Sequence, residues 1–119
     1  MSDFTGLDLA TIEKLKQLGG GPFAGQMIDL FFQYLPGKLA EAKAGLGGGD
    51  FHAIQQAVHP IKSSANNVGA VAVRELARQI EQLALDKNGE TIPALLHDLE
   101  EAYARVAVQL KEQRAGLEA

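Results

Sequence analysis

The sequence predicts an all-α protein, an antiparallel four-helix bundle with a short extra N-terminal helix. Helix-favouring Ala, Leu, Glu, Gln and Lys are frequent, whereas aromatic residues make up only 6% of the 119 residues and tryptophan is absent. Glycine-containing segments also separate stretches in which apolar residues recur every three or four positions. The length and a hydrophobic content of 46% fit a single domain, residues 1–119, with one core.

Five helical segments are expected, at about residues 9–18, 22–46, 50–67, 70–87 and 91–113. The first is short, follows the favoured N-cap residue Asp8, and places Ile12, Leu15 and Leu18 on one side. Short connections join the other four, and in all-helical proteins such connections make neighbouring helices antiparallel. We therefore expect the first helix to pack as a lid against a bundle formed by the other four.

The second segment begins at Pro22 and contains three aromatic residues that we expect in the core, Phe31, Phe32 and Tyr34. Helical character continues beyond Pro36, so one helix kinked at this proline is expected in place of two separate helices.

The third segment carries the candidate functional residues. Asp50 is suited to cap its start, and its apolar residues form one stripe that should face the core: Phe51, Ile54, Val58, Ile61, Ala65 and Val68. His59 lies roughly 130° around the helix from the centre of that stripe. We therefore expect its ring to face solvent, with Gln55, Lys62, Ser63 and Asn66 around it.

Composition excludes several classes of function. Without cysteine the chain has no disulfide, thiolate metal ligand or cysteine nucleophile. The segment Met1–Phe4 lacks the basic and apolar features of an export signal, and no apolar stretch approaches the roughly 18 residues that span a bilayer. A net charge of −4 and no basic stripe argue against a nucleic-acid partner. We expect a cytoplasmic monomer that does not contact membranes.

The twelve residues from His59 to Ala70, HPIKSSANNVGA, resemble the signature of histidine phosphotransfer (HPt) domains. That signature runs His, any residue, Leu or Ile, Lys, Gly or Ser, Ser, then small or polar residues and Gly-Ala. The resemblance implies that His59 is phosphorylated, that Lys62 stabilises charge on the phosphoryl group, and that Gly69 forms the turn after the helix. The surface approached by a receiver domain would comprise Gln55, Ser63, Asn66 and Gly69.

The resemblance also implies the function and the partners. The chain would be a phosphocarrier in a multistep two-component phosphorelay, taking a phosphoryl group onto His59 from one receiver-domain aspartate and passing it to another receiver. A hybrid sensor histidine kinase would be a further partner. No nucleotide-binding or kinase motif is present, so we expect no ATP-dependent kinase activity. No cofactor or metal of its own is expected, and the receiver would supply Mg²⁺. The direction of transfer, and whether the domain is free-standing, stay open.

Glu81 is the candidate residue for orienting His59. It aligns with a position where the family often keeps a Glu or Gln that accepts a hydrogen bond from Nδ1, which would leave Nε2 free to attack phosphorus. The alternative is a solvated surface glutamate near Arg74 and Arg78.

Pro60 departs from an ordinary helix interior. It removes the N–H that would bond to the carbonyl of Gln56 and disfavours helical geometry at His59, so we expect a kink or widened turn. Misplacement of the imidazole would slow transfer. A second hypothesis is therefore a module that binds and sequesters a receiver without turnover, leaving the lifetime of the receiver's phosphoryl group unchanged. A third, a cofactor or metal site inside the bundle, would need inward-facing histidines or carboxylates.

The remaining candidates are surface residues. His52 and His97 are expected to be solvated and not to bind metal. A docking patch for a receiver would include Val71, Leu9 or Ile12, although Ile12 is more simply placed in the core.

Overall fold

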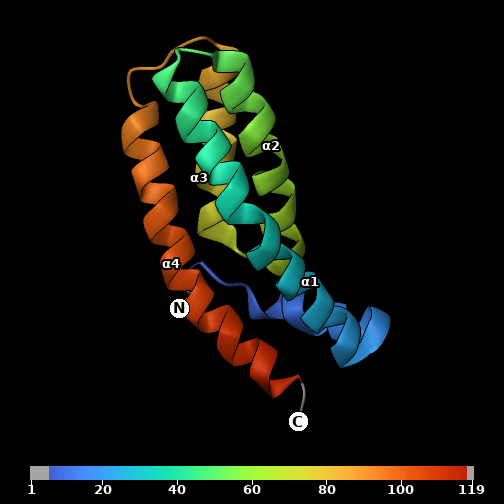
Figure 1. Ribbon diagram of the computed structural model, residues 1–119. Coiled ribbons are helices and arrows are strands. Elements are labelled where there is room, and N and C mark those ends of the chain that lie inside the picture. The colour runs from blue at the N-terminus through green and yellow to red at the C-terminus, as the bar shows by residue number, and fades with distance from the viewer. Residues whose placement is uncertain (1–5, 118–119) are drawn as a thin grey trace.

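The computed structural model describes residues 6–117, so Met1–Phe4, from which we expect no export signal, lie outside the described residues. Helices α1 (Leu9–Gly47), α2 (Phe51–Val68), α3 (Val71–Leu85) and α4 (Ile92–Gly116) follow in chain order. Figure 1 shows the bundle helices running alternately up and down, and each packs against its neighbours in the order α1, α2, α3, α4 and back to α1. The predicted all-α class and antiparallel bundle are confirmed.

Helix α1 consists of two helical parts joined at Gly20. The φ of 84° and ψ of 179° at Gly20 lie in a region that only glycine adopts readily. The first part corresponds to the expected N-terminal helix and begins after Asp8, whose carboxylate accepts a hydrogen bond from the N–H of Ala10 at 3.0 Å. Figure 1 shows it, in blue, lying across the lower end of the bundle. The second part continues as an α-helix through Pro36.

The N-terminal part of α1 packs against the core through only part of its predicted apolar face. Ile12 and Leu15 are buried, which leaves Ile12 unable to serve in a docking patch, whereas Leu9 is exposed. Leu18 is 72% exposed, contrary to the prediction. The chain reverses at Gly20, so the last turn before it projects beyond the bundle, as Figure 1 shows.

The aromatic residues of α1 occupy three different environments. Phe31 is fully buried and packs edge-on against Tyr103 of α4 with ring centroids 5.6 Å apart, and Phe32 is half-buried beside them. Tyr34 is 54% exposed, so its predicted place in the core is wrong. It lies one residue, about 100° of helical rotation, before the buried Leu35, and this turns its ring to the edge of the core face.

Both ends of α2 are fixed. The Asp50 carboxylate accepts a hydrogen bond from a backbone N–H in the first turn at 3.0 Å. At the other end Gly69 adopts φ 78°, and an added Cβ there would lie 2.7 Å from the carbonyl oxygen of Asp8. An isolated antiparallel bridge between Leu7 and Ala70 ties the N-terminal segment to the same turn. The caps therefore define where α2 begins and ends, and the bridge joins its C-terminal turn to the N-terminal segment.

Helix α2 presents the predicted stripe to the core. Every stripe residue is buried except Phe51, which is half-buried. The chain is α-helical at each position from Phe51 to Val68, so the widened turn expected at Pro60 is not formed. Pro60 has no N–H to donate to the carbonyl of Gln56, and Gln56 is itself exposed to solvent.

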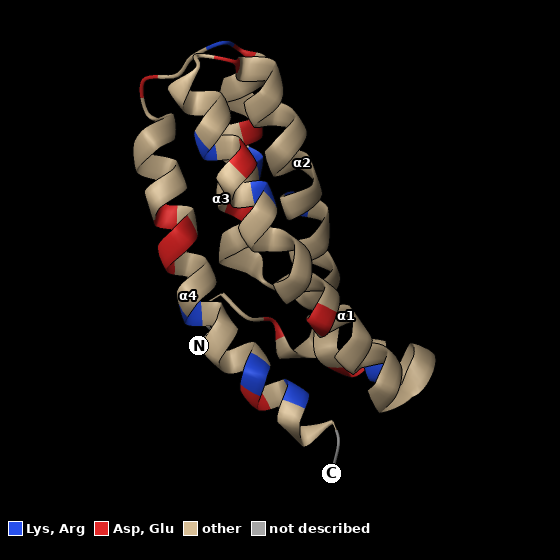
Figure 2. Ribbon diagram, viewed as in Figure 1, with Lys and Arg blue, Asp and Glu red and all other residues tan. Residues whose placement is uncertain are grey.

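Charged residues of both signs are interspersed along the helices, as Figure 2 shows. Over residues 6–117, none of the helices has the length and apolar character needed to cross a membrane.

Candidate functional site

The candidate site lies on the face that α2 shares with α3. His59 lies outside the buried stripe of α2, and its side chain is 56% exposed. Glu81 projects from the middle of α3 towards it, and the side chain of Glu81 is only 9% exposed. The distance from Nδ1 of His59 to Oε2 of Glu81 is 2.7 Å, a strong hydrogen bond across the two helices.

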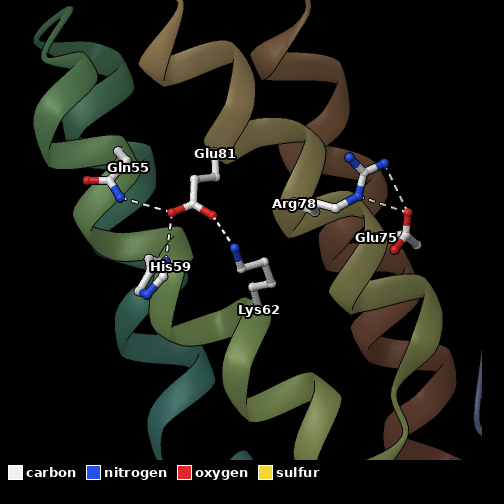
Figure 3. A network of polar contacts seen from close by, with 6 residues as sticks. All are labelled: Gln55, His59, Lys62, Glu75, Arg78 and Glu81. Carbon is white, nitrogen blue, oxygen red and sulfur yellow. Dashed lines mark hydrogen bonds and ion pairs between the residues drawn. The ribbon is translucent and has the colours of Figure 1, made fainter.

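Three side chains of α2 converge on the Glu81 carboxylate, as Figure 3 shows. Oε2 accepts from His59 Nδ1 and from Nε2 of Gln55 at 2.9 Å, and Oε1 accepts from Nζ of Lys62 at 2.6 Å. The three donors lie at intervals of four and three residues, which places them on one face of α2 over nearly two turns. This cluster explains how a nearly buried carboxylate is stabilised, since every buried charge needs such partners.

Glu81 is held in its ionised form. Burial acts to raise the pKa of the Glu81 carboxyl, but hydrogen bonds from Lys62, Gln55 and His59, together with the charge of Lys62, outweigh that effect and leave the pKa below its ordinary value. An ionised carboxylate can only accept hydrogen bonds. Nδ1 of His59 must therefore carry the proton that it donates to Glu81.

The proton on Nδ1 determines what the other ring nitrogen can do. A neutral imidazole with hydrogen on Nδ1 keeps its free lone pair on Nε2. None of the residues described in the structure forms a hydrogen bond with Nε2 of His59. The site therefore presents a nucleophilic nitrogen on an exposed, oriented ring.

The alternative of Glu81 as a solvated glutamate near two arginines is wrong. Arg78 and Arg74 instead form ion pairs with Glu75, at 3.1 and 3.5 Å, on the more exposed side of α3. Arg74 also donates to the side-chain oxygen of Asn66 at 3.3 Å.

The residues expected to meet a receiver are not all accessible. Ser63 and Asn66 are exposed on α2 beyond His59. Gly69 is buried, and Asp8 and Thr11 pack against it, so it forms the turn but cannot belong to a contact surface. Gln55 is half-buried and directs its amide nitrogen to Glu81. Sequence reasoning missed this contact, although the spacing of four residues from His59 was a signal for it.

The other two histidines stand apart from the site. His52 is exposed on α2, and His97 lies on α4 with its Nε2 3.6 Å from a carboxylate oxygen of Glu101. No group of three or more His, Asp or Glu side chains among residues 6–117 is arranged to hold a metal ion. Among the buried residues described, Glu81 is the charged one, and its carboxylate is bound by Gln55, His59 and Lys62.

The fold and site together define a small helical bundle that presents one oriented imidazole to solvent. The model of the Hpt domain family matches residues 26–109. Histidine-containing phosphotransfer protein 2 of Arabidopsis thaliana is 27% identical over 104 residues, which cover 85% of this chain and 67% of the plant protein. The crystal structure of histidine-containing phosphotransfer protein B from Pseudomonas aeruginosa PAO1 has the same fold, with a TM-score of 0.87 and 24% identity over 92% of this chain and 95% of the other.

The chain belongs to the Hpt domain family, because the family model covers well over half of it. Membership assigns it to histidine phosphotransfer in phosphorelays, as a phosphocarrier and not as a kinase.

Proposed function

We propose that His59 is the phosphoacceptor of this domain, and that it takes a phosphoryl group from the aspartyl phosphate of one response-regulator receiver and passes it to the aspartate of another. A hybrid sensor histidine kinase would supply the first receiver. The observation that carries the proposal is the contact between Nδ1 of His59 and the ionised Glu81, which leaves Nε2 as the nucleophile.

On the side of the Hpt domain, the transfer step uses His59 and Glu81, whose positions the structure defines. The Nε2 lone pair attacks phosphorus, the P–N bond forms, and the P–O bond to the receiver aspartate breaks with its electron pair returning to the carboxylate. The proton stays on Nδ1, and Glu81 stabilises the positive charge that the ring acquires. Reversal of the same step delivers the phosphoryl group to the next receiver. Mg²⁺ would be held by the receiver, and there it would supply charge neutralisation for the phosphoryl oxygens.

The Lys62 ammonium is placed where it can bind a phosphoryl group on His59. Its side chain is 32% exposed and is held by one ion pair to Oε1 of Glu81. A phosphoryl group on Nε2 of His59 brings two negative charges within one helical turn of this ammonium, which then has a second anionic partner. We propose that Lys62 stabilises charge on the phosphoryl oxygens during transfer.

The receiver is proposed to dock over the exposed side of α2, where it meets α1. Ser63, one turn after His59, adds little bulk there. A hollow of about 250 Å³ lies between the two helices and is lined by Tyr34, Leu35, Lys38, Pro60, Ile61 and Ser64, of which Pro60 directly follows His59 in the chain. The half-exposed ring of Tyr34 at its edge gives this side an apolar contact that the core does not use.

The test is phosphotransfer from a ³²P-labelled receiver in the presence of Mg²⁺. Wild type and His52→Gln should acquire label, whereas His59→Gln should not; His52 is the matched control because it is an exposed histidine on the same helix. Failure to label wild type, or equal labelling of His59→Gln, would refute the proposal. A receiver that binds the domain tightly while its phosphoryl lifetime stays unchanged would instead identify a sequestering module.

A further inference from the structure

The two oxygens of the Glu81 carboxylate are divided between different partners. Oε2 accepts from His59 Nδ1 at 2.7 Å and from Gln55 Nε2 at 2.9 Å, while Oε1 accepts, among residues 6–117, from Lys62 alone. Figure 3 shows Gln55 and His59 on one side of the carboxylate and Lys62 on the other. Oε2, the oxygen that orients the His59 ring, therefore also accepts from the Gln55 amide, whereas the Lys62 ammonium binds the other oxygen.

This division matters once Lys62 has a competing partner. In the proposed function, a phosphoryl group on His59 attracts the Lys62 ammonium away from Oε1. Glu81 is 9% exposed, so little water is available to replace the lost donor and hold the carboxylate in place. Among the described residues, Gln55 is then the remaining donor, besides His59 itself, that holds the Glu81 carboxylate in place while His59 is phosphorylated.

We propose that Gln55 is a positioning residue, which holds Oε2 of Glu81 in line with Nδ1 of His59 and so keeps the imidazole in its reactive tautomer whether or not Lys62 remains on Oε1. Its role in transfer rests on the proposed function of His59, but its effect on the ring does not. A neutral amide suits this task because it is a weaker partner for a phosphoryl group than a second cation would be. Its nitrogen must face the carboxylate, because the amide oxygen is not a donor.

The position of Gln55 on α2 supports this role. It lies four residues before His59, so both side chains leave the same face of α2 and reach one atom of α3. Its neighbour Gln56 has the same side chain but lies on the exposed side of the helix. Comparing substitutions at Gln55 and Gln56 therefore separates the loss of the hydrogen bond to Glu81 from the loss of a glutamine side chain as such.

The experiment compares Gln55→Met with Gln56→Met, because methionine keeps the length of the side chain and removes its N–H donors. The ¹⁵N chemical shifts of the His59 ring, recorded for the neutral imidazole of the unphosphorylated protein, report which nitrogen carries the proton. We expect Gln55→Met to raise the fraction with hydrogen on Nε2 and to slow phosphotransfer about tenfold, the effect of losing one hydrogen bond to a charged group. Gln56→Met should change neither.

Two further variants test the mechanism. Gln55→Lys returns an N–H donor of similar reach and should restore the Nδ1–H tautomer. In a Lys62→Met background, Gln55→Met should shift the tautomer more than in wild type, since Glu81 then has lost both other donors. Unchanged ring shifts in Gln55→Met, or equal shifts in Gln56→Met, would overturn the inference. A tautomer shift in Gln55→Met would support it even where wild type acquires no label, a result that counts against the proposed function alone.

Discussion

Replacing Glu81 by glutamine should slow phosphotransfer while leaving the bundle folded. The amide keeps the size of the side chain but carries one acceptor and one donor in place of two acceptors. If its oxygen faces Lys62, its NH₂ meets Nδ1 of His59 and favours the tautomer with hydrogen on Nε2, which blocks the nucleophile. If the amide flips, Lys62 faces a donor. The first orientation reverses the donor and acceptor of the 2.7 Å contact with His59, and the second loses the 2.6 Å contact with Lys62.

The expected magnitude follows from the contact to His59. A hydrogen bond to a charged group is worth about 1.5–3 kcal/mol. Because the side chain of His59 is 56% exposed, water replaces part of the loss and the lower end applies. About 1.5–2 kcal/mol corresponds to transfer that is about 10- to 30-fold slower.

The assay is single-turnover transfer from a phosphorylated receiver, with the folded state verified by circular dichroism. Glu75→Gln is the matched control, because Glu75 lies on the same helix, is 42% exposed and pairs with arginine; its rate should stay within about twofold of wild type. A folded Glu81→Gln protein that transfers at the wild-type rate would show that this carboxylate does not orient the nucleophile.

Three predictions concern stability. The pKa of Glu81 is lower in the folded chain than its ordinary value of 4.5, so its contribution to stability is present above that value and is lost as pH falls through the lowered pKa. Urea unfolding at about pH 7 and about pH 3 should therefore show a larger loss of stability for wild type than for Glu81→Gln, and equal losses would contradict this. Gly69→Ala should destabilise the chain by about 2 kcal/mol, since φ is 78° and the Cβ would meet a carbonyl oxygen at 2.7 Å. Gly37→Ala, whose Cβ would meet nothing within 4 Å beyond its own helix backbone and chain neighbours, should stabilise the chain by about 0.5–1 kcal/mol, and the same direction of change for both would refute the reasoning.

Several local features of the fold were predictable because short-range chemistry controls them. Asp8 and Asp50 cap helices as expected, and Gly69 supplies the left-handed turn that ends α2. Tyr34 and Leu18 were misplaced because periodicity specifies the apolar side of a helix but not how far the neighbouring helices extend along it.

The candidate site was predicted in part. The apolar stripe of α2 was enough to place His59 in solvent, since whatever lies opposite a buried stripe is exposed. The sequence left two alternatives for Glu81, a partner of the His59 ring or a solvated surface residue, because Glu81 lies 22 residues away on another helix. The contact of Gln55 with the same carboxylate was not foreseen, and its predicted place among receiver-facing residues conflicts with its half-buried amide.

By itself the sequence determined the helical class, most helix ends, and the face of α2 on which His59 stands, because each follows from residues within one or two turns of each other. Only the tertiary structure decided which oxygen of Glu81 serves which donor and that Gly69 is covered by the N-terminal segment. Those outcomes depend on the register between α2 and its neighbours. That register is a property of the packed bundle, and no single helix contains it.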